Sequence, residues 1–168
     1  MATLAVWRFD TPRGADESAN SLLALDRQGT LVLRDAATVS WDRSRKKPCT
    51  RQVTGTGTDG NLGPSFWGLL FGMIFFVPLL GAAIGAAGGA LAGSLTDVGI
   101  DDPFINRVRD QVIPGTSALF VLSPDPVLHT IEAALTTHHP SGLIATSLSP
   151  EQDGALRSVF AEDDAPPP

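Results

Sequence analysis

The longest uncharged stretch of the chain limits what the chain can fold into more than any other feature. No charged side chain occurs in the 37 residues 60–96, and most of residues 66–95 are apolar. A run of 18 or more uncharged, mostly apolar residues is the usual sign of membrane contact, because about 20 helical residues span the hydrocarbon layer. The segment therefore predicts either contact with lipid or burial against other protein.

Glycines recur every fourth residue through the second half of this segment. Residues four apart lie on one face of a helix, and a row without side chains lets another helix backbone approach closely, as in GxxxG packing. Each glycine costs a helix roughly 1 kcal/mol relative to alanine, so this helix needs packing or lipid to be stable. We predict a helix-docking glycine zipper at Gly81, Gly85, Gly89 and Gly93, with a second pair of docking glycines at Gly68 and Gly72.

Pro78 lies between the two halves of the segment. It lacks a backbone N–H, which predicts a kink or a tight turn between Val77 and Leu80. We therefore expect a helical hairpin with Pro78 as its hinge, helices over residues 65–77 and 80–95, and small residues on the inner faces.

The chain on either side of the hairpin has the pattern of two strand-helix-strand units. In the first, strands at 3–9 and 30–34 flank a helix that opens at Thr11 and Pro12 and stops at Gly29. In the second, strands at 117–122 and 143–148 flank a helix that opens at Pro124 and Pro126. This order predicts an α+β fold of the ferredoxin-like type, with four antiparallel strands and two helices on one face.

Three further elements are expected around these units. Residues 37–41 and 49–54 can pair as an extra hairpin, Asp101 or Asp102 caps a helix opened by Pro103, and Ser149 with Gln152 forms a capping box before a last helix. The predicted organisation is residues 1–59 for the first half of the domain with the extra hairpin, 60–98 for the glycine-zipper hairpin, 99–162 for the linking helix and the second half, and 163–168 for a disordered tail.

Charge limits the partners. The net charge of −6 argues against a nucleic-acid binder, because phosphate contacts need clustered Lys and Arg. The one basic cluster fits either a solvated hairpin tip or a patch facing anionic lipid on the cytoplasmic side. The N-terminus lacks a basic start followed by an apolar stretch, so we expect no signal peptide and a cytoplasmic domain. The basic cluster consists of Arg43, Arg45, Lys46, Lys47 and Arg51.

The expected domain restricts how the segment can meet a membrane. If both units share one sheet, the two ends of the segment lie on the same side of a bilayer, and two crossings need about 40 apolar residues, more than are present. Three arrangements stay open: a re-entrant hairpin, a hairpin buried in a soluble homo-oligomer, or one span between separately folded halves. Trp7, Trp41 and Trp67 are expected to be mostly core residues, and Trp67 alone is also placed to anchor at a membrane interface.

No arrangement of residues predicts catalysis. Residues 55–60 match GxGxxG, but an apolar helix follows, so a flexible joint is the preferred interpretation. His138 and His139 have no further ligand at metal-binding spacing and are expected to be a helix cap and solvent-facing pair. Cys49 is alone, which predicts no disulfide and a buried or inert thiol. We expect no enzyme, no metal and no cofactor.

Four segments of the chain resemble a known family. They are AATVSWD (residues 36–42), KKPCTRQV (46–53), the run from Phe66 to Asp102, and PGTSALFVL (114–122). Through these segments the chain resembles the bacterial family named domain of unknown function 1269, whose members are described as predicted membrane proteins. The resemblance covers nearly the whole chain. The resemblance implies no reaction and therefore no catalytic residue.

Together these features predict a non-enzymatic protein that assembles with itself through the zipper. The expected location is the bacterial inner membrane, with lipid as a further partner and the folded domain facing the cytoplasm. The alternative is a cytoplasmic, soluble homo-oligomer that binds a ligand or senses stress, with the hairpins forming the core of the assembly.

Overall fold

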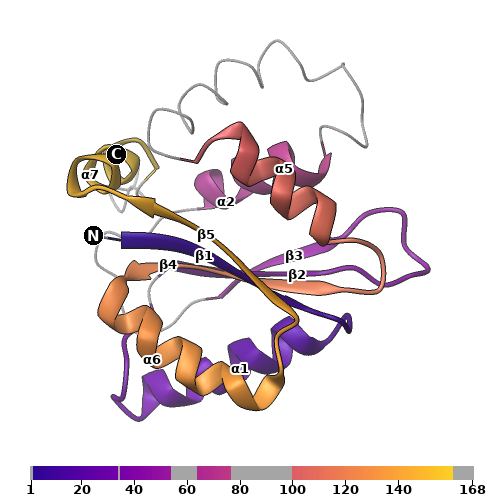
Figure 1. Ribbon diagram of the computed structural model, residues 1–168, viewed down its shortest axis with the longest axis horizontal. Coiled ribbons are helices and arrows are strands. Elements are labelled where there is room, and N and C mark those ends of the chain that lie inside the picture. The colour runs from indigo at the N-terminus through magenta and orange to yellow at the C-terminus, as the bar shows by residue number, and fades with distance from the viewer. Residues whose placement is uncertain (1, 34, 54–63, 77–99, 161–168) are drawn as a thin grey trace, which may run out of the picture.

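The computed structural model describes residues 2–33, 35–53, 64–76 and 100–160. These residues form a mixed α/β fold with five strands in one antiparallel sheet and five α-helices (Figure 1). The strands are β1 (Ala2–Phe9), β2 (Asp35–Ser40), β3 (Cys49–Val53), β4 (Ser117–Pro124) and β5 (Gly142–Leu148). The helices are α1 (Gly14–Arg27), α2 (Pro64–Phe71), α5 (Asp102–Gln111), α6 (Asp125–Leu135) and α7 (Pro150–Phe160), with a π-helical turn η1 (Gly72–Phe76) and a 3₁₀ turn η3 (Thr136–His138).

The sheet interleaves the two halves of the chain. Its strand order is β3-β2-β4-β1-β5, and every pair of neighbours is antiparallel. Strand β4 lies between β2 and β1, so that Phe120 is opposite Val6 on one side and Ala37 on the other. Because each half supplies neighbours to the other, the arrangement with one membrane span between separately folded halves is wrong.

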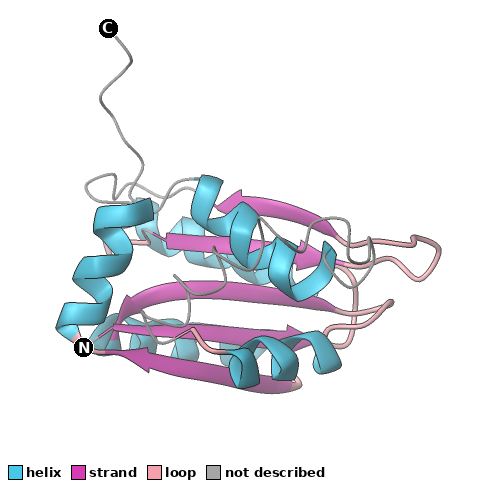
Figure 2. Ribbon diagram, turned by 90° about the horizontal axis from the view of Figure 1, so that it is seen from above, coloured by secondary structure: helices cyan, strands magenta, loops and turns pink. Residues whose placement is uncertain are grey.

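Helices cover both faces of this sheet (Figures 1 and 2). Side chains alternate along a strand, so that Val6 and Phe120 belong to one core while Trp7 and Val121 belong to the other. Helices α1 and α6 complete the core around Trp7, and α2, η1 and α5 complete the core around Phe120. The sequence predicted two helices on one face of the sheet, so the packing of α2, η1 and α5 on the other face was not predicted.

One predicted strand is wrong. Residues 30–33 form no strand, and the strand that follows α1 is β2. Leu31 and Leu33 are buried while Val32 is exposed, which explains the alternating pattern. The backbone of these residues nevertheless pairs with no strand of the sheet. The expected extra hairpin is formed by β2 and β3, and β2 therefore serves both the first unit and the hairpin.

Helix ends agree with several local predictions. The Asp101 carboxylate accepts a hydrogen bond from the Phe104 backbone N–H at 3.1 Å. Ser149 and Gln152 form the expected capping box, with reciprocal bonds of 3.1 Å and 2.9 Å. Helix α1 ends at Arg27, and Gly29 follows its C-cap with a φ of +78°, a conformation that favours glycine.

The start of α1 differs from its prediction. The helix begins at Gly14, two residues later than expected, although the Thr11 hydroxyl still accepts from the Gly14 N–H at 3.1 Å. The next N–H, that of Ala15, donates to the Ser117 hydroxyl of β4 at 2.9 Å. The Ser117 hydroxyl in turn donates to the Thr11 carbonyl at 2.7 Å. A side chain far away in the sequence thus completes the first turn of this helix.

Candidate functional site

The first part of the uncharged segment is built into the core of the domain. Helix α2 and turn η1 form one continuous helical stretch on the face of the sheet to which Phe120 of β4 belongs. The sequence predicted a helix over residues 65–77 here. Phe71 packs edge-on against Phe120 of β4 with ring centroids 5.0 Å apart, and Phe75 packs edge-on against Trp41 at 6.0 Å. The buried side chains of the stretch are Phe66, Trp67, Leu70, Phe71, Ile74 and Phe75.

Of the two roles considered for Trp67, a core position is confirmed and an anchor at a membrane interface is wrong. Its side chain is 3% exposed, stacks on Phe71 with ring centroids 5.8 Å apart, and meets the edge of Phe120 at 6.4 Å. An aromatic residue that anchors at a bilayer surface needs its polar end in the interface, which this packing does not allow. Trp67 is therefore a core residue.

The glycine pair of this helix faces away from the core. Gly68 is exposed and Gly72 is half-buried. A methyl group built at either position would meet no described atom within 4 Å. The described part of the chain thus offers no packing partner for the pair, and the docking role of Gly68 and Gly72 stays a prediction.

Arg109 of α5 ties down the end of this helical stretch. Its guanidinium donates from Nε to the Ile74 carbonyl at 2.9 Å and from a terminal nitrogen to the Met73 carbonyl at 2.7 Å. Carbonyls at the end of a helix have no intrahelical donor, and a cation there also complements the helix dipole. This role of Arg109 was not predicted from the sequence. The pattern that could have indicated it is a cation at the edge of the apolar face formed by Phe104, Ile105 and Val108.

The described residues on either side of residues 77–99 lie on the same face of the sheet. Turn η1 ends at Phe76, and the chain returns at Ile100, which is fully buried in the core that also contains Ile74. Turn η1 and helix α5 are in contact. The hinge Pro78 and the zipper residues Gly81, Gly85, Gly89 and Gly93 lie outside the described residues, so their roles also stay predictions.

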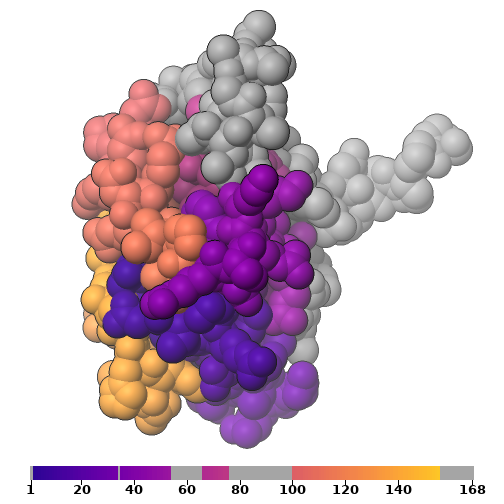
Figure 3. All heavy atoms as spheres, turned by 90° about the vertical axis from the view of Figure 1, so that its right-hand side faces the viewer, coloured from indigo at the N-terminus to yellow at the C-terminus, as the bar shows by residue number. Residues whose placement is uncertain are grey.

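The basic cluster occupies the turn between β2 and β3 and the following strand. Figure 3 looks onto this end of the molecule, where the turn lies beside the residues that join α5 to β4. All five cluster residues are exposed. Four of them belong to the turn, whereas Arg51 lies on β3 and pairs with Asp16 of α1 at 3.1 Å. The proposed lipid-facing patch therefore reduces to Arg43, Arg45, Lys46 and Lys47, with Arg51 directed to α1.

Two further residues of this region are Asp42 in the turn and Cys49 at the start of β3. The Ser44 backbone N–H and then its hydroxyl donate to the Asp42 carboxylate at 3.0 Å and 2.9 Å, and these bonds lower the pKa of Asp42 from its ordinary 3.8, with a smaller contribution from Arg45. Cys49 at the start of β3 is exposed, so of the two expected alternatives, a buried or an inert thiol, the buried one is wrong and the inert one stays a prediction.

The histidines and acids show no metal site in the described part of the chain. No group of three or more His, Cys, Asp or Glu side chains is placed there to hold an ion. His139 ends η3 in a left-handed conformation with φ of 53° and is exposed, as predicted. His138 differs from its prediction, because it is half-buried and its ring Nε2 shares a hydrogen bond of 2.8 Å with the Ser21 hydroxyl of α1.

Within the described ranges, no helix combines the length and the apolar character that a membrane crossing requires. A family model described as protein of unknown function (DUF1269) matches residues 61–161. The match starts after β3, so it covers less of the chain than the expected resemblance. No curated protein and no solved structure matches the chain.

Proposed function

The chain belongs to the DUF1269 family of proteins of unknown function, and from this premise we propose that it is a non-enzymatic protein that assembles with itself through its glycine zipper. In this proposal the zipper residues of one copy dock against the same segment of another. The observation that carries it is that α2, η1 and α5 anchor both ends of residues 77–99 on one face of the sheet. A segment held at both ends can present a hairpin to a second molecule.

We propose that the assembly forms at the bacterial inner membrane, with the folded domain on the cytoplasmic side. The 23 residues 77–99 contain one charged side chain, Asp97, and include all four zipper glycines. Two full crossings need about 40 apolar residues, so the proposed hairpin enters the bilayer without spanning it twice. The exposed arginines and lysines of the β2–β3 turn provide a surface that anionic lipid would attract.

The rival is a soluble homo-oligomer in which the hairpins bury one another. One observation favours it: residues of Phe66 to Phe75 already serve the core of the domain, so only residues 76–95 of the apolar run 66–95 are left to meet lipid. A docking hairpin of that length needs no bilayer if its small faces are covered by other copies. Both versions use the same glycines.

We also propose that the domain is of the ferredoxin-like type. Two features support this: the connections β1–α1–β2 and β4–α6–β5, and the strand order β2-β4-β1-β5 that is left when β3 is set aside. In this description β3, α2, η1 and α5 are additions that hold the hairpin.

The test is the mass of the particle formed by the Gly85→Leu variant. We expect the wild type to form a particle larger than the 17.6 kDa monomer and the variant to lose it, because a leucine prevents close approach of two backbones. Gly154→Leu is the matched control, since a side chain at Gly154 of α7 would meet no described atom within 4 Å.

Light scattering after size exclusion, in buffer and in detergent, supplies the measurement. A particle of unchanged mass in Gly85→Leu would contradict assembly through the zipper. Cell fractionation separates the two versions: wild-type protein that pellets with membranes and needs detergent supports the membrane version, and a large particle in the detergent-free supernatant supports the soluble rival.

A further inference from the structure

An apolar cavity lies where turn η1 meets the end of helix α5, on the side of the sheet opposite α1 and α6. Its volume is about 210 Å³. Pockets that hold drug-sized ligands measure about 300–1,000 Å³, so this cavity suits a narrow group such as an alkyl chain. Its apolar lining consists of Trp41, Ile74, Phe75, Val112, Ile113 and Pro114.

Hydrogen bonds and ring packing hold the walls of this cavity in place. Arg109 also lines it, but its guanidinium is bonded to two carbonyls of η1 at 2.9 Å and 2.7 Å. On the other side, Trp41 packs edge-on against Phe75 with ring centroids 6.0 Å apart and donates its indole N–H to the Arg45 carbonyl at 3.1 Å. The cavity is therefore preformed, and its surface is suited to an apolar group.

The turn between β2 and β3 brings positive charge to this cavity. Gly115, which follows Pro114 of the lining, donates its N–H to the Trp41 carbonyl at 2.6 Å. A methyl group built on Gly115 would lie 2.7 Å from Nε of Arg43, and Figure 3 shows the turn beside the residues that join α5 to β4. Residues 42–47 carry four cations and one carboxylate, although the net charge of the chain is −6. An anionic group is therefore attracted to this end of the molecule.

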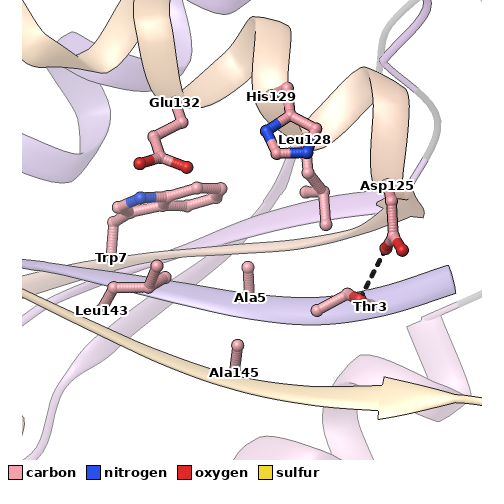
Figure 4. Close-up of a pocket in the computed structure, with 9 residues that line it drawn as sticks. All are labelled: Thr3, Ala5, Trp7, Asp125, Leu128, His129, Glu132, Leu143 and Ala145. Carbon is pink, nitrogen blue, oxygen red and sulfur yellow. Dashed lines mark hydrogen bonds between the residues drawn. The ribbon is translucent and has the colours of Figure 1, made fainter.

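A second cavity, between α6 and the sheet edge formed by β1 and β5, has the opposite charge (Figure 4). Its described lining includes the carboxylates of Asp125 and Glu132 and no lysine or arginine. The Thr3 hydroxyl donates to Asp125 at 2.8 Å, so this carboxylate already has a partner within the chain. Because like charges repel, an anionic ligand with an alkyl chain is favoured at the cavity beside η1 over this one.

We propose that the cavity beside η1 binds the alkyl chain of an anionic amphiphile, whose head group lies at Arg43 and Arg45 of the β2–β3 turn. Burial of the chain supplies affinity, and the arginines supply the preference for negative charge. A free fatty acid and an anionic phospholipid share this chemistry. The proposal rests on the lipid contact proposed for this turn and not on assembly through the zipper, so its test and the Gly85→Leu test fail independently.

The test is quenching of tryptophan fluorescence in the full chain by 11-bromoundecanoate, at neutral pH and below the concentration at which this acid forms micelles. Trp41 is half-buried and lines the cavity, whereas Trp7 and Trp67 are each 3% exposed, so a bound bromine atom quenches chiefly Trp41. We expect saturable quenching that is lost in Trp41→Phe, while calorimetry still detects binding to that variant.

Two pairs of variants separate the cavity from the rest of the surface. Ile113→Asn should weaken binding about fivefold, because a side chain that contacts the alkyl chain becomes polar. Val32→Asn, at a position outside the cavity that is 50% exposed against 47% for Ile113, should leave the affinity unchanged. Arg43→Gln should weaken binding about threefold, as expected for an exposed charge pair, and Arg27→Gln on α1 should not.

Three results would overturn the proposal: no saturable quenching, equal effects within either pair of variants, or equally tight binding of the neutral 11-bromoundecanol. The first means that no chain enters the cavity, the second means binding elsewhere, and the third means that the turn does not select a negative charge. Vesicles of phosphatidylglycerol with brominated chains distinguish the two sources. Quenching by these vesicles that Ile113→Asn reduces indicates a bilayer lipid, and quenching by the free acid alone indicates a fatty acid.

Discussion

At the scale of single residues, Gly115 joins the two segments that meet at the β2–β3 end of the sheet. Its N–H donates to the Trp41 carbonyl at 2.6 Å, and its φ of +90° is a conformation that side chains disfavour. A methyl group built on Gly115 would lie 2.7 Å from Nε of Arg43, whose side chain covers this turn. Gly115 thus holds the basic turn against the loop that follows α5.

We predict that Gly115→Ala lowers the free energy of unfolding by about 1 kcal/mol or more, because alanine is strained at this φ even if Arg43 moves aside. Gly154→Ala in the exposed part of α7 is the matched substitution and should raise the free energy of unfolding by up to about 1 kcal/mol. Urea unfolding of both variants measures the difference. Equal effects of the two alanines would contradict the role given to the conformation of Gly115.

At the scale of elements, the junction of η1 with α5 determines how firmly α2 and η1 are held on the domain. Turn η1 is π-helical and is the last described element before residues 77–99, and its Met73 and Ile74 carbonyls face Arg109 of α5. Arg109 supplies donors to both of these carbonyls and also bonds to Asn106 of its own helix at 3.0 Å. One side chain therefore couples turn η1, which precedes residues 77–99, to helix α5, which follows them.

We predict that Arg109→Met lowers the free energy of unfolding by about 1–3 kcal/mol, because it leaves two carbonyls of η1 without a charged donor. Faster amide hydrogen exchange in α2 and η1 should accompany the loss, with little change in α1 and α6. Arg107→Met removes the same charge from an exposed position of α5 and serves as the control. If both variants exchange like the wild type, the clamp does not hold the segment.

At the scale of the whole molecule, the strand order makes the two halves dependent on each other. The second half contributes β4 and β5, which do not pair with each other because β1 lies between them. The region that matches the family model, residues 61–161, lacks β1, β2 and β3. That region on its own would expose the faces of β4 and β5 that the first half covers.

We therefore predict that a fragment of residues 61–168 does not fold by itself and regains structure when residues 1–60 are added as a separate peptide. The reason is that β1 supplies both the backbone partners and the apolar side chains that join β4 to β5. Circular dichroism and the dispersion of the NMR spectrum measure the outcome. Cooperative thermal unfolding of the fragment alone would show that the interleaved sheet is not required.

The predictions from sequence succeeded where the relevant contacts lie within a few residues of one another. The Asp101 cap, the Ser149–Gln152 box and the stop at Gly29 are each made within one or two helical turns, so the residue types nearly determine them. The strand at residues 30–34 failed for the opposite reason. Alternating burial is visible in the residues themselves, but pairing depends on where another strand lies.

By itself, the sequence determined several helix caps, the order of the strands and helices apart from the strand expected at residues 30–34, and the presence of a long uncharged segment with glycines every fourth residue. Only the tertiary structure decided that residues of Phe66 to Phe75 belong to the core of the domain and that Ser117 completes the first turn of α1. The physical reason is that an apolar side chain has the same pattern whether lipid or protein covers it. Which surface covers it depends on contacts between residues far apart in the chain.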